Sequence, residues 1–145
     1  MKAHPKAGGI SINWLIFGSN GHVTKPEGGV LENYTMCARK DFGVNHITKT
    51  ITDPMRILSA SGHTSVYRRG FYNLDENGNI VHGRLSTKAV NFEQIRINHY
   101  FTKSLEEYKA KIARGKADQP DLRTMRDFTT HDQNVIHDTE ILSYM

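Results

Sequence analysis

A segment near residue 100 joins a strand pattern to a well-marked helix start. The stretch from Ile95 to Tyr100 is rich in residues that build a buried strand, and Ser104-Leu105-Glu106-Glu107 follows it closely. A serine three residues before a glutamate is a capping box, in which each side chain binds the backbone N–H at the other position. Gly115 then ends the helix. The segment 95–115 therefore predicts a strand that leads into a capped helix, and a ligand is expected here first.

A second strand is predicted near the N-terminus. Apolar residues occupy every second position from Ile10 to Ile16, which is the period of a strand. Leu15 and Phe17 make the other face apolar as well, so we expect the far end of the strand to be covered on both sides. The loop Gly18–His22 follows, and its glycines allow positive φ or close approach of a ligand. Its backbone N–H groups could cradle a phosphate, although no Walker Gly-Lys-Ser/Thr is present.

The rest of the chain predicts shorter elements. The apolar stripe of Val30–Arg39 indicates a helix, and the alternation in Ile47–Ile51 indicates a strand. Asn77-Gly78 stands between two apolar runs, which is typical of a hairpin. We interpret the last 25 or so residues, from about 119 to 145, as an irregular or weakly helical tail. The 145 residues suit one domain.

The net charge of +4 is compatible with phosphorylated ligands or nucleic acid. The basic residues form no run of five, however, which favours an ordinary solvated surface and makes nucleic acid a weak expectation. Cys37 is the single cysteine, which excludes an internal disulfide and a multi-cysteine zinc site. The sequence shows neither a signal-peptide pattern nor an apolar run long enough for a membrane span, so we expect a cytoplasmic protein.

Two histidines are placed where a ligand could reach them. His63 follows a small-residue loop, and His99 lies four residues before Lys103. This spacing places an imidazole near a strand end and an ammonium at the next helix start, where the helix N–H groups could also bind an anion. A hydrogen-bonded core network at Asn98-His99-Tyr100 is the alternative. The chain has no Asp-x-Asp pair, and one histidine cannot hold a divalent cation.

Four blocks of the sequence together resemble bacterial family 2-like glycosyltransferases and their family 92 relatives. Their order and rough spacing agree from residue 9 to about 118, and the first and last blocks are the most specific. The blocks are Ile12–His22, Val30–Tyr34, Lys49–His63 and Ile97–Gly115. The resemblance implies an α/β fold: a partial GT-A (Rossmann-like) domain with a mixed sheet and flanking helices. It also implies that this chain is the C-terminal part of that domain.

Such an enzyme would move a sugar from a nucleotide-sugar, such as a UDP-sugar, to a carbohydrate acceptor in polysaccharide biosynthesis. The resemblance implies Mn²⁺ or Mg²⁺ as cofactor. The aspartate-rich metal motif of these enzymes is absent from the sequence, so most metal ligands would lie outside this chain. The alternative is a non-catalytic module that binds carbohydrate or nucleic acid, which the basic charge and the Gly-x-x-Gly loop also suit.

The resemblance also implies roles for individual residues. His63 would complete the metal shell, and Lys103 would offset negative charge on the leaving group. Glu32 would be the base that deprotonates the acceptor hydroxyl. The usual acidic pair is Glu32-Asn33 here, and a helix-surface carboxylate is the alternative for Glu32. The residues expected to bind donor or acceptor are Trp14, Gly18, Ser19, Gly21, His22, His99 and Lys103.

Overall fold

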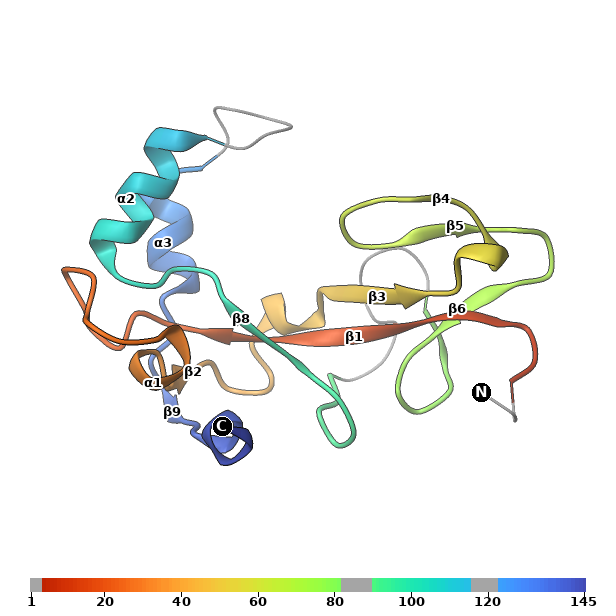
Figure 1. The fold of residues 1–145 in the computed structure, drawn as a ribbon, viewed down its shortest axis with the longest axis horizontal. Helices are drawn as coiled ribbons and strands as arrows, with labels where there is room; N and C mark the ends of the chain where they lie inside the picture. Colours follow the sequence, from red (N-terminus) through yellow and green to blue (C-terminus); the bar gives the residue numbers. More distant parts are fainter. Residues whose placement is uncertain (1–3, 82–89, 116–122) are drawn as a thin grey trace. The chain divides into compact units, whose positions relative to one another are not determined.

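The structure is a computed structural model that describes residues 4–81, 90–115 and 123–145 (Figure 1). It is mixed α/β, with a mixed sheet and few helices. The chain divides into two compact units, the first made of Met1–Leu15 with Lys40–Ile97 and the second of Ile16–Arg39 with Asn98–Met145. Strand β1 (Ala7–Phe17) therefore contributes residues to both units. Within the described ranges, no helix combines the length and apolar character needed to cross a membrane.

The first unit is built on the N-terminal part of β1. Strand β3 (Thr48–Thr52) pairs with it antiparallel, from Gly9 opposite Thr52 to Asn13 opposite Thr48. Strand β6 (Tyr72–Leu74) pairs with β1 in parallel, which makes this sheet mixed. The unit's other elements are β4 (Ile57–Ala60), which pairs antiparallel with β5 (Ser65–Tyr67), and the short 3-10 helices η1 (Gly43–His46) and η2 (Pro54–Arg56).

The predicted hairpin is confirmed in the first unit. Strand β7 (Ile80–Val81) pairs antiparallel with β6. The buried Asp75 carboxylate accepts hydrogen bonds from the N–H groups of Asn77 and Asn79, at 2.9 and 2.8 Å. Gly78 has a φ of 80°, which a glycine adopts without strain. The turn therefore satisfies its own polar groups.

The second unit surrounds the end of β1. Strand β2 (Met36–Cys37) pairs with β1 at Phe17, and β9 (Ile136–His137) pairs with β2. Strand β8 (Ile97–Tyr100) also pairs with β1. Helices α2 (Leu105–Arg114) and α3 (Met125–His131) lie side by side (Figure 1). The remaining helices are α1 (Val30–Asn33) and the 3-10 helix η3 (Glu140–Tyr144).

Local signals predicted some of these elements well. The capping box at Ser104 and Glu107 is present, and Gly115 ends α2 with a φ of 73°. The strand at residues 10–17 is also confirmed, and its end is fully buried, since Ile16 and Phe17 are 0% exposed. The side chains of β8 are only half-buried, however, so the prediction of a buried strand there is corrected.

Two segments differ from the expectation. The helix predicted for Val30–Arg39 is only four residues long, because the chain leaves helical geometry at Tyr34 and then pairs as β2. Where we expected an irregular or weakly helical tail, residues 123–145 form α3, β9 and η3. The Asp127 carboxylate accepts a hydrogen bond from the Thr124 N–H at 2.8 Å and so caps the start of α3.

Candidate functional site

The predicted site residues form two groups, one in each unit. Trp14 and His63 belong to the first unit. The second unit holds Glu32, His99, Lys103 and the segment Gly18–His22, which we call the glycine loop.

In the first unit, Trp14 and His63 lie against each other. Trp14 is 7% exposed, and its ring centroid is 5.3 Å from that of His63. His63 Nδ1 lies 3.2 Å from the Thr48 carbonyl oxygen. In the tautomer that donates this hydrogen bond, Nε2 carries the lone pair, which is the arrangement usual for a metal-binding histidine. The geometry at His63 is therefore compatible with one bond to a metal.

The surroundings of His63 do not complete a metal site. Among residues 4–81, 90–115 and 123–145, no group of three His, Cys, Asp or Glu side chains is placed to hold an ion. The Lys49 ammonium lies 5.9 Å from the centroid of the Trp14 ring and donates a hydrogen bond to the Gly62 carbonyl. Its positive charge opposes a second cation nearby. The described residues alone therefore do not fit Mn²⁺ or Mg²⁺.

In the second unit, each backbone N–H of the glycine loop from residue 19 to residue 22 donates a hydrogen bond. The Ser19 N–H donates to Asp132 Oδ1 at 2.6 Å, and the Asn20 N–H donates to Asn134 Oδ1 at 2.8 Å. The Gly21 and His22 N–H groups donate to the Ser19 hydroxyl and carbonyl oxygens, both at 3.0 Å. A phosphate cradle made of these N–H groups, as the sequence suggested, is therefore not available.

The turns of this loop do have the expected conformation. Asn20 and Gly21 have φ values of 53° and 76°. Asparagine and glycine are the residues that adopt this left-handed conformation most readily. Gly21 is exposed and His22 is half-exposed, whereas Ser19 is buried. The loop thus presents Gly21 and His22 to solvent.

The N-terminus of α2 is also occupied by protein groups. The Leu105 N–H donates to the His22 carbonyl at 3.0 Å, and the Glu106 N–H donates to the Val23 carbonyl at 2.9 Å. The Glu107 N–H donates to the Ser104 hydroxyl oxygen at 3.2 Å. The prediction that an anion uses these N–H groups is therefore wrong. Instead, the hydrogen bonds fasten the helix start to the glycine loop.

A cluster of polar side chains surrounds this junction. The Tyr34 hydroxyl donates to Glu107 Oε2 at 2.6 Å and accepts a hydrogen bond from the Ser104 N–H at 3.1 Å. The Ser104 hydroxyl donates to the same carboxylate oxygen at 2.9 Å. Lys103 Nζ lies 3.4 Å from Glu107 Oε1, and the His22 ring meets the Tyr34 ring at right angles with centroids 5.6 Å apart. The cluster connects two of the predicted ligand-binding residues, His22 and Lys103.

The cluster shifts the acidity of two of its members. Burial raises the pKa of Tyr34 to about 12, and the neighbouring Glu107 carboxylate contributes to this rise by accepting the hydroxyl hydrogen bond. Burial also opposes ionisation of Glu107. Hydrogen bonds from Tyr34 and Ser104, together with the Lys103 charge, outweigh that effect and lower the pKa of Glu107. Glu107 is therefore a firmly ionised counter-ion for Lys103.

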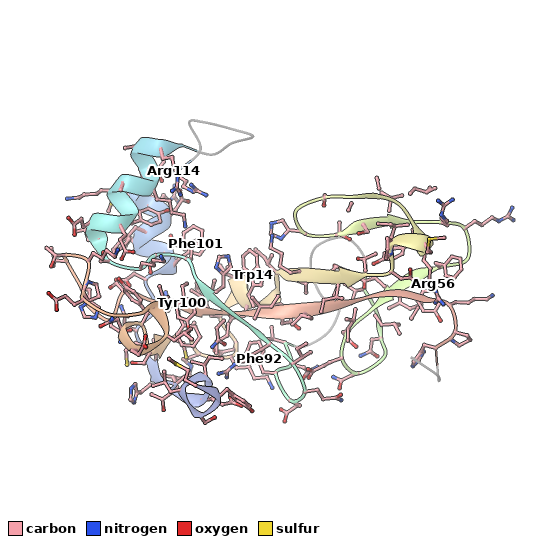
Figure 2. All side chains as sticks on the ribbon, in the orientation of Figure 1. Trp14, Arg56, Phe92, Tyr100, Phe101 and Arg114 are labelled. Atoms are coloured by element: carbon pink, nitrogen blue, oxygen red, sulfur yellow. The ribbon has the colours of Figure 1, made fainter. Side chains whose placement is uncertain are left out.

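His99 is a residue of β8 and directly precedes Tyr100 and Phe101, which are labelled in Figure 2. Its ring meets Phe101 edge-on at a centroid distance of 5.8 Å. Phe101 in turn stacks on His131 at 4.1 Å and lies beneath Lys111, whose Nζ is 4.3 Å from the ring centroid. His99 therefore belongs to an aromatic cluster.

Glu32 is exposed on the four-residue helix α1. Its carboxylate turns back over Gly29, where a Cβ atom would lie 2.1 Å from Glu32 Oε2. The adjacent Asn33 side chain donates to the Glu27 and Gly29 carbonyls, at 2.7 and 2.8 Å, and fixes the loop before the helix. This geometry favours the helix-surface alternative for Glu32.

Several residues of the site were not predicted from the sequence to be site residues. Tyr34 and Glu107 were part of an apolar stripe and a helix cap, and their mutual hydrogen bond spans 73 positions. Asp132 and Asn134 lie in a polar segment without periodicity. Comparison of the chain with protein-family models, with curated proteins and with solved structures finds no match.

Proposed function

We propose that this chain is the C-terminal portion of a GT-A-type glycosyltransferase that moves a sugar from a nucleotide-sugar, a UDP-sugar, to a carbohydrate acceptor in the cytoplasm. The junction between the glycine loop and α2 is the observation that carries the proposal. The two backbone hydrogen bonds there join His22 and Val23 to Leu105 and Glu106. His22 ends one of the two most specific blocks of the resemblance, Val23 follows it directly, and Leu105 and Glu106 belong to the other of these two blocks. In a ligand site, motifs that are distant in the sequence are expected to come together in one local structure, as these two motifs do.

The side chains at this junction suit the chemistry of sugar transfer. The bond between the sugar C1 and the phosphate oxygen breaks, and negative charge develops on the leaving nucleoside diphosphate. Lys103 is a cation that a partly buried carboxylate holds in place, so it suits stabilisation of that charge. The attacking acceptor hydroxyl loses its proton as its oxygen bonds to C1, and Glu32 is proposed as the base from the resemblance alone, since its exposed place on α1 by itself suits a surface carboxylate.

A Mn²⁺ or Mg²⁺ ion remains part of the proposal through the resemblance. His63 would supply one ligand, and a bound ion would supply positive charge for a phosphate group. Its other ligands would come from outside the described residues, so the roles of Lys103 and Glu32 are argued without it.

The alternative of a binding module is less well supported. Trp14 is buried, whereas an aromatic platform for a sugar ring needs an exposed face, so Trp14 is not a stacking surface for a sugar in a binding module or in the enzyme. A Gly-x-x-Gly loop that clamps a nucleic-acid backbone needs open N–H groups, and those of Ser19 and Asn20 are bound to Asp132 and Asn134. We therefore keep the enzyme as the proposal.

Nucleotide binding tests the proposal directly. UDP and a panel of nucleotide-sugars are titrated, with Mg²⁺, into the 145-residue chain and into protein that includes any sequence encoded ahead of residue 1, and backbone amide NMR signals are followed. We expect UDP to shift the signals of Gly21, His22 and Lys103. Lys103→Gln should weaken binding about 10-fold, since an ionic hydrogen bond contributes roughly 1.5–3 kcal/mol.

Lys109→Gln is the matched control, because Lys109 is an exposed lysine of α2, the helix that begins directly after Lys103 and Ser104. Its affinity for UDP should equal that of the unaltered protein. The proposal fails if neither form of the protein binds any nucleotide-sugar. It also fails if the shifted signals lie away from the junction.

A further inference from the structure

The segment 132–134, just after α3, holds the glycine loop through a chain of hydrogen bonds. Asp132 Oδ1 accepts from both the Ser19 N–H at 2.6 Å and the Asn134 side-chain amide at 2.9 Å. Asn134 Oδ1 in turn accepts from the Asn20 N–H at 2.8 Å. The bond to Ser19 is short and charge-assisted, a type roughly twice as strong as a neutral hydrogen bond. The two side chains thus bind consecutive N–H groups of the loop.

Glycine at position 18 makes this approach possible. A Cβ atom at Gly18 would lie 2.4 Å from Asn134 Oδ1 and 2.6 Å from the Gln133 carbonyl oxygen. Directly after this contact, the chain is also hydrogen-bonded to strand β2. The Val135 N–H donates to the Cys37 carbonyl at 3.0 Å, and β9 follows as the partner of β2. These hydrogen bonds hold the segment 132–134 next to the glycine loop.

The loop is also held from its other side. The Asn20 side chain donates to the Thr35 hydroxyl at 3.1 Å and accepts from the Met36 N–H at 2.8 Å. Hydrogen bonds from the segment 132–134 and from the start of β2 hold the loop on its two sides. A phosphate that displaced Asp132 would therefore have to break hydrogen bonds on both sides. Gly21 and His22 remain exposed or half-exposed while these contacts are intact. A ligand can therefore meet Gly21 and His22 without displacing Asp132 or Asn134.

We propose that Asp132 and Asn134 are positioning residues, which hold the glycine loop in the conformation that presents Gly21 and His22 to the nucleotide-sugar or its acceptor. This inference rests on the proposed function. The rival is that Asp132 occupies the place of a ligand phosphate and competes with it. The contact of Asn134 speaks against competition with a phosphate. Asn134 binds the Asn20 N–H through a neutral amide oxygen, which does not resemble an anion.

Amide hydrogen exchange tests the positioning itself, without any ligand. In Asp132→Ala we expect the Ser19 amide to exchange at least about 10-fold faster, and in Asn134→Ala the Asn20 amide, because each loses its acceptor. Gln133→Ala is the control, since the Gln133 side chain is bonded only locally, to the Thr130 carbonyl at 3.0 Å. Unchanged exchange at Ser19 and Asn20 in the first two variants would overturn the proposal.

Nucleotide-sugar affinity then separates positioning from competition. We expect Asp132→Ala to weaken UDP-sugar binding about 10-fold and Asp132→Asn, which keeps an acceptor oxygen and the fold, to restore most of it. Tighter binding in Asp132→Ala would show competition and would overturn the proposal. If the unaltered protein binds no nucleotide-sugar, the proposed function fails, and amide exchange alone decides whether Asp132 and Asn134 position the loop.

Discussion

Lys103 has a backbone conformation that lysine rarely adopts. Its φ is 53°, in the left-handed region, which costs a residue with a Cβ roughly 1–2 kcal/mol. The buried neighbours Thr102 and Ser104 hold it there. Its side chain is 37% exposed and lies beside the Glu107 carboxylate. Strain of this kind is kept where the surroundings enforce it, and such positions cluster at functional sites.

Replacement of Lys103 by glycine should separate stability from binding. In Lys103→Gly the relief of strain offsets the greater flexibility of the unfolded chain, so we expect the free energy of unfolding to stay equal or to rise by up to about 1 kcal/mol. UDP affinity should fall in the same variant, because the cation is lost. Urea denaturation and UDP titration measure the two effects.

Lys109→Gly supplies the contrast from the interior of α2. There glycine should cost about 1 kcal/mol of stability and leave UDP affinity unchanged. If Lys103→Gly were destabilised as much as Lys109→Gly, the left-handed backbone of Lys103 would not be strained. If it bound UDP normally, Lys103 would have no part in the site.

The Tyr34–Glu107 pair predicts a loss of stability in alkali. The pKa of Tyr34 is about 12 in the folded chain and 10 in the ordinary case, so the folded state holds the proton more tightly. The contribution of Tyr34 to the free energy of unfolding should therefore be constant below pH 10 and decrease as the pH rises from 10 to about 12. Urea denaturation at a series of pH values measures the slope, and tyrosine absorbance measures the ionisation.

Two variants check this assignment. Tyr34→Phe should remove the part of the alkaline slope that comes from Tyr34, and an unchanged slope would contradict the prediction. Glu107→Gln should bring the pKa of Tyr34 down toward its ordinary value, because the carboxylate that disfavours the phenolate is gone. On the acid side, the pKa of Glu107 is lowered, so its contribution to stability should be present above pH 4.5 and be lost as the pH falls through the folded-state pKa.

At the scale of elements, the contact between the glycine loop and the segment before β9 depends on the absence of a side chain at position 18. Gly18→Ala should force Asn134 and the Gln133 carbonyl away, since the added Cβ would lie 2.4 and 2.6 Å from them. Overpacking of this kind costs about 1–3 kcal/mol. Gly43→Ala is the control, because nothing lies within 4 Å of its Cβ position, and it should be neutral or slightly stabilising.

Chemical denaturation of both glycine variants measures this effect, and amide exchange at Ser19 reports whether the contact with Asp132 is retained. Equal stability of Gly18→Ala and Gly43→Ala would mean that the segment 132–134 yields easily. The hydrogen bonds of Asp132 and Asn134 would then constrain the glycine loop only weakly.

The same elements show what the sequence could predict. The helix α2 was predicted in full because its start, Ser104 and Glu107, and its end, Gly115, are local signals. The strand β1 was predicted because its apolar residues recur at every second position, a period that fits a strand and not a helix. Strands β2 and β9 contain two residues each and exist only through pairing with distant partners, so no local pattern marks them.

The predicted helix at Val30–Arg39 failed for a related reason. Tyr34 and Ala38 are buried as an apolar stripe requires, but the segment that carries them leaves the helix and joins the sheet. The glycine loop shows the same limit at the site. Its backbone conformation followed from Asn20 and Gly21, whereas the acceptors of the Ser19 and Asn20 N–H groups lie more than 100 positions away.

At the scale of the whole molecule, the candidate residues divide between two units that share β1. The unit with the glycine loop holds the proposed cation, Lys103, and the proposed base, Glu32. The unit with β3 holds His63, the one proposed metal ligand. No cluster of three ligands completes a metal site within the described residues, so on the proposed function the ligands beyond His63 come from outside those residues.

Trp14 allows this to be measured. It is the only tryptophan in the chain, and its ring lies 5.3 Å from His63, so paramagnetic Mn²⁺ bound at His63 Nε2 should quench its fluorescence while Mg²⁺ should not. We expect quenching in the presence of UDP when the protein includes any sequence encoded ahead of residue 1, with the emission of the matching Trp14→Phe variant subtracted so that only Trp14 is compared. The measured quantity is the ratio of intensities with Mn²⁺ and with Mg²⁺, which corrects for changes in the Trp14 environment.

His63→Ala should bring this ratio to one, whereas His137→Ala, which removes an exposed histidine from the other unit, should leave it unchanged. Quenching that persists in His63→Ala would place the ion elsewhere and would remove His63 from the proposed metal shell. UDP binding measured in the same samples shows whether the nucleotide needs the ion at all. If UDP binding is lost in Lys103→Gln but kept in His63→Ala, the junction of the glycine loop and α2 binds the nucleotide independently of His63.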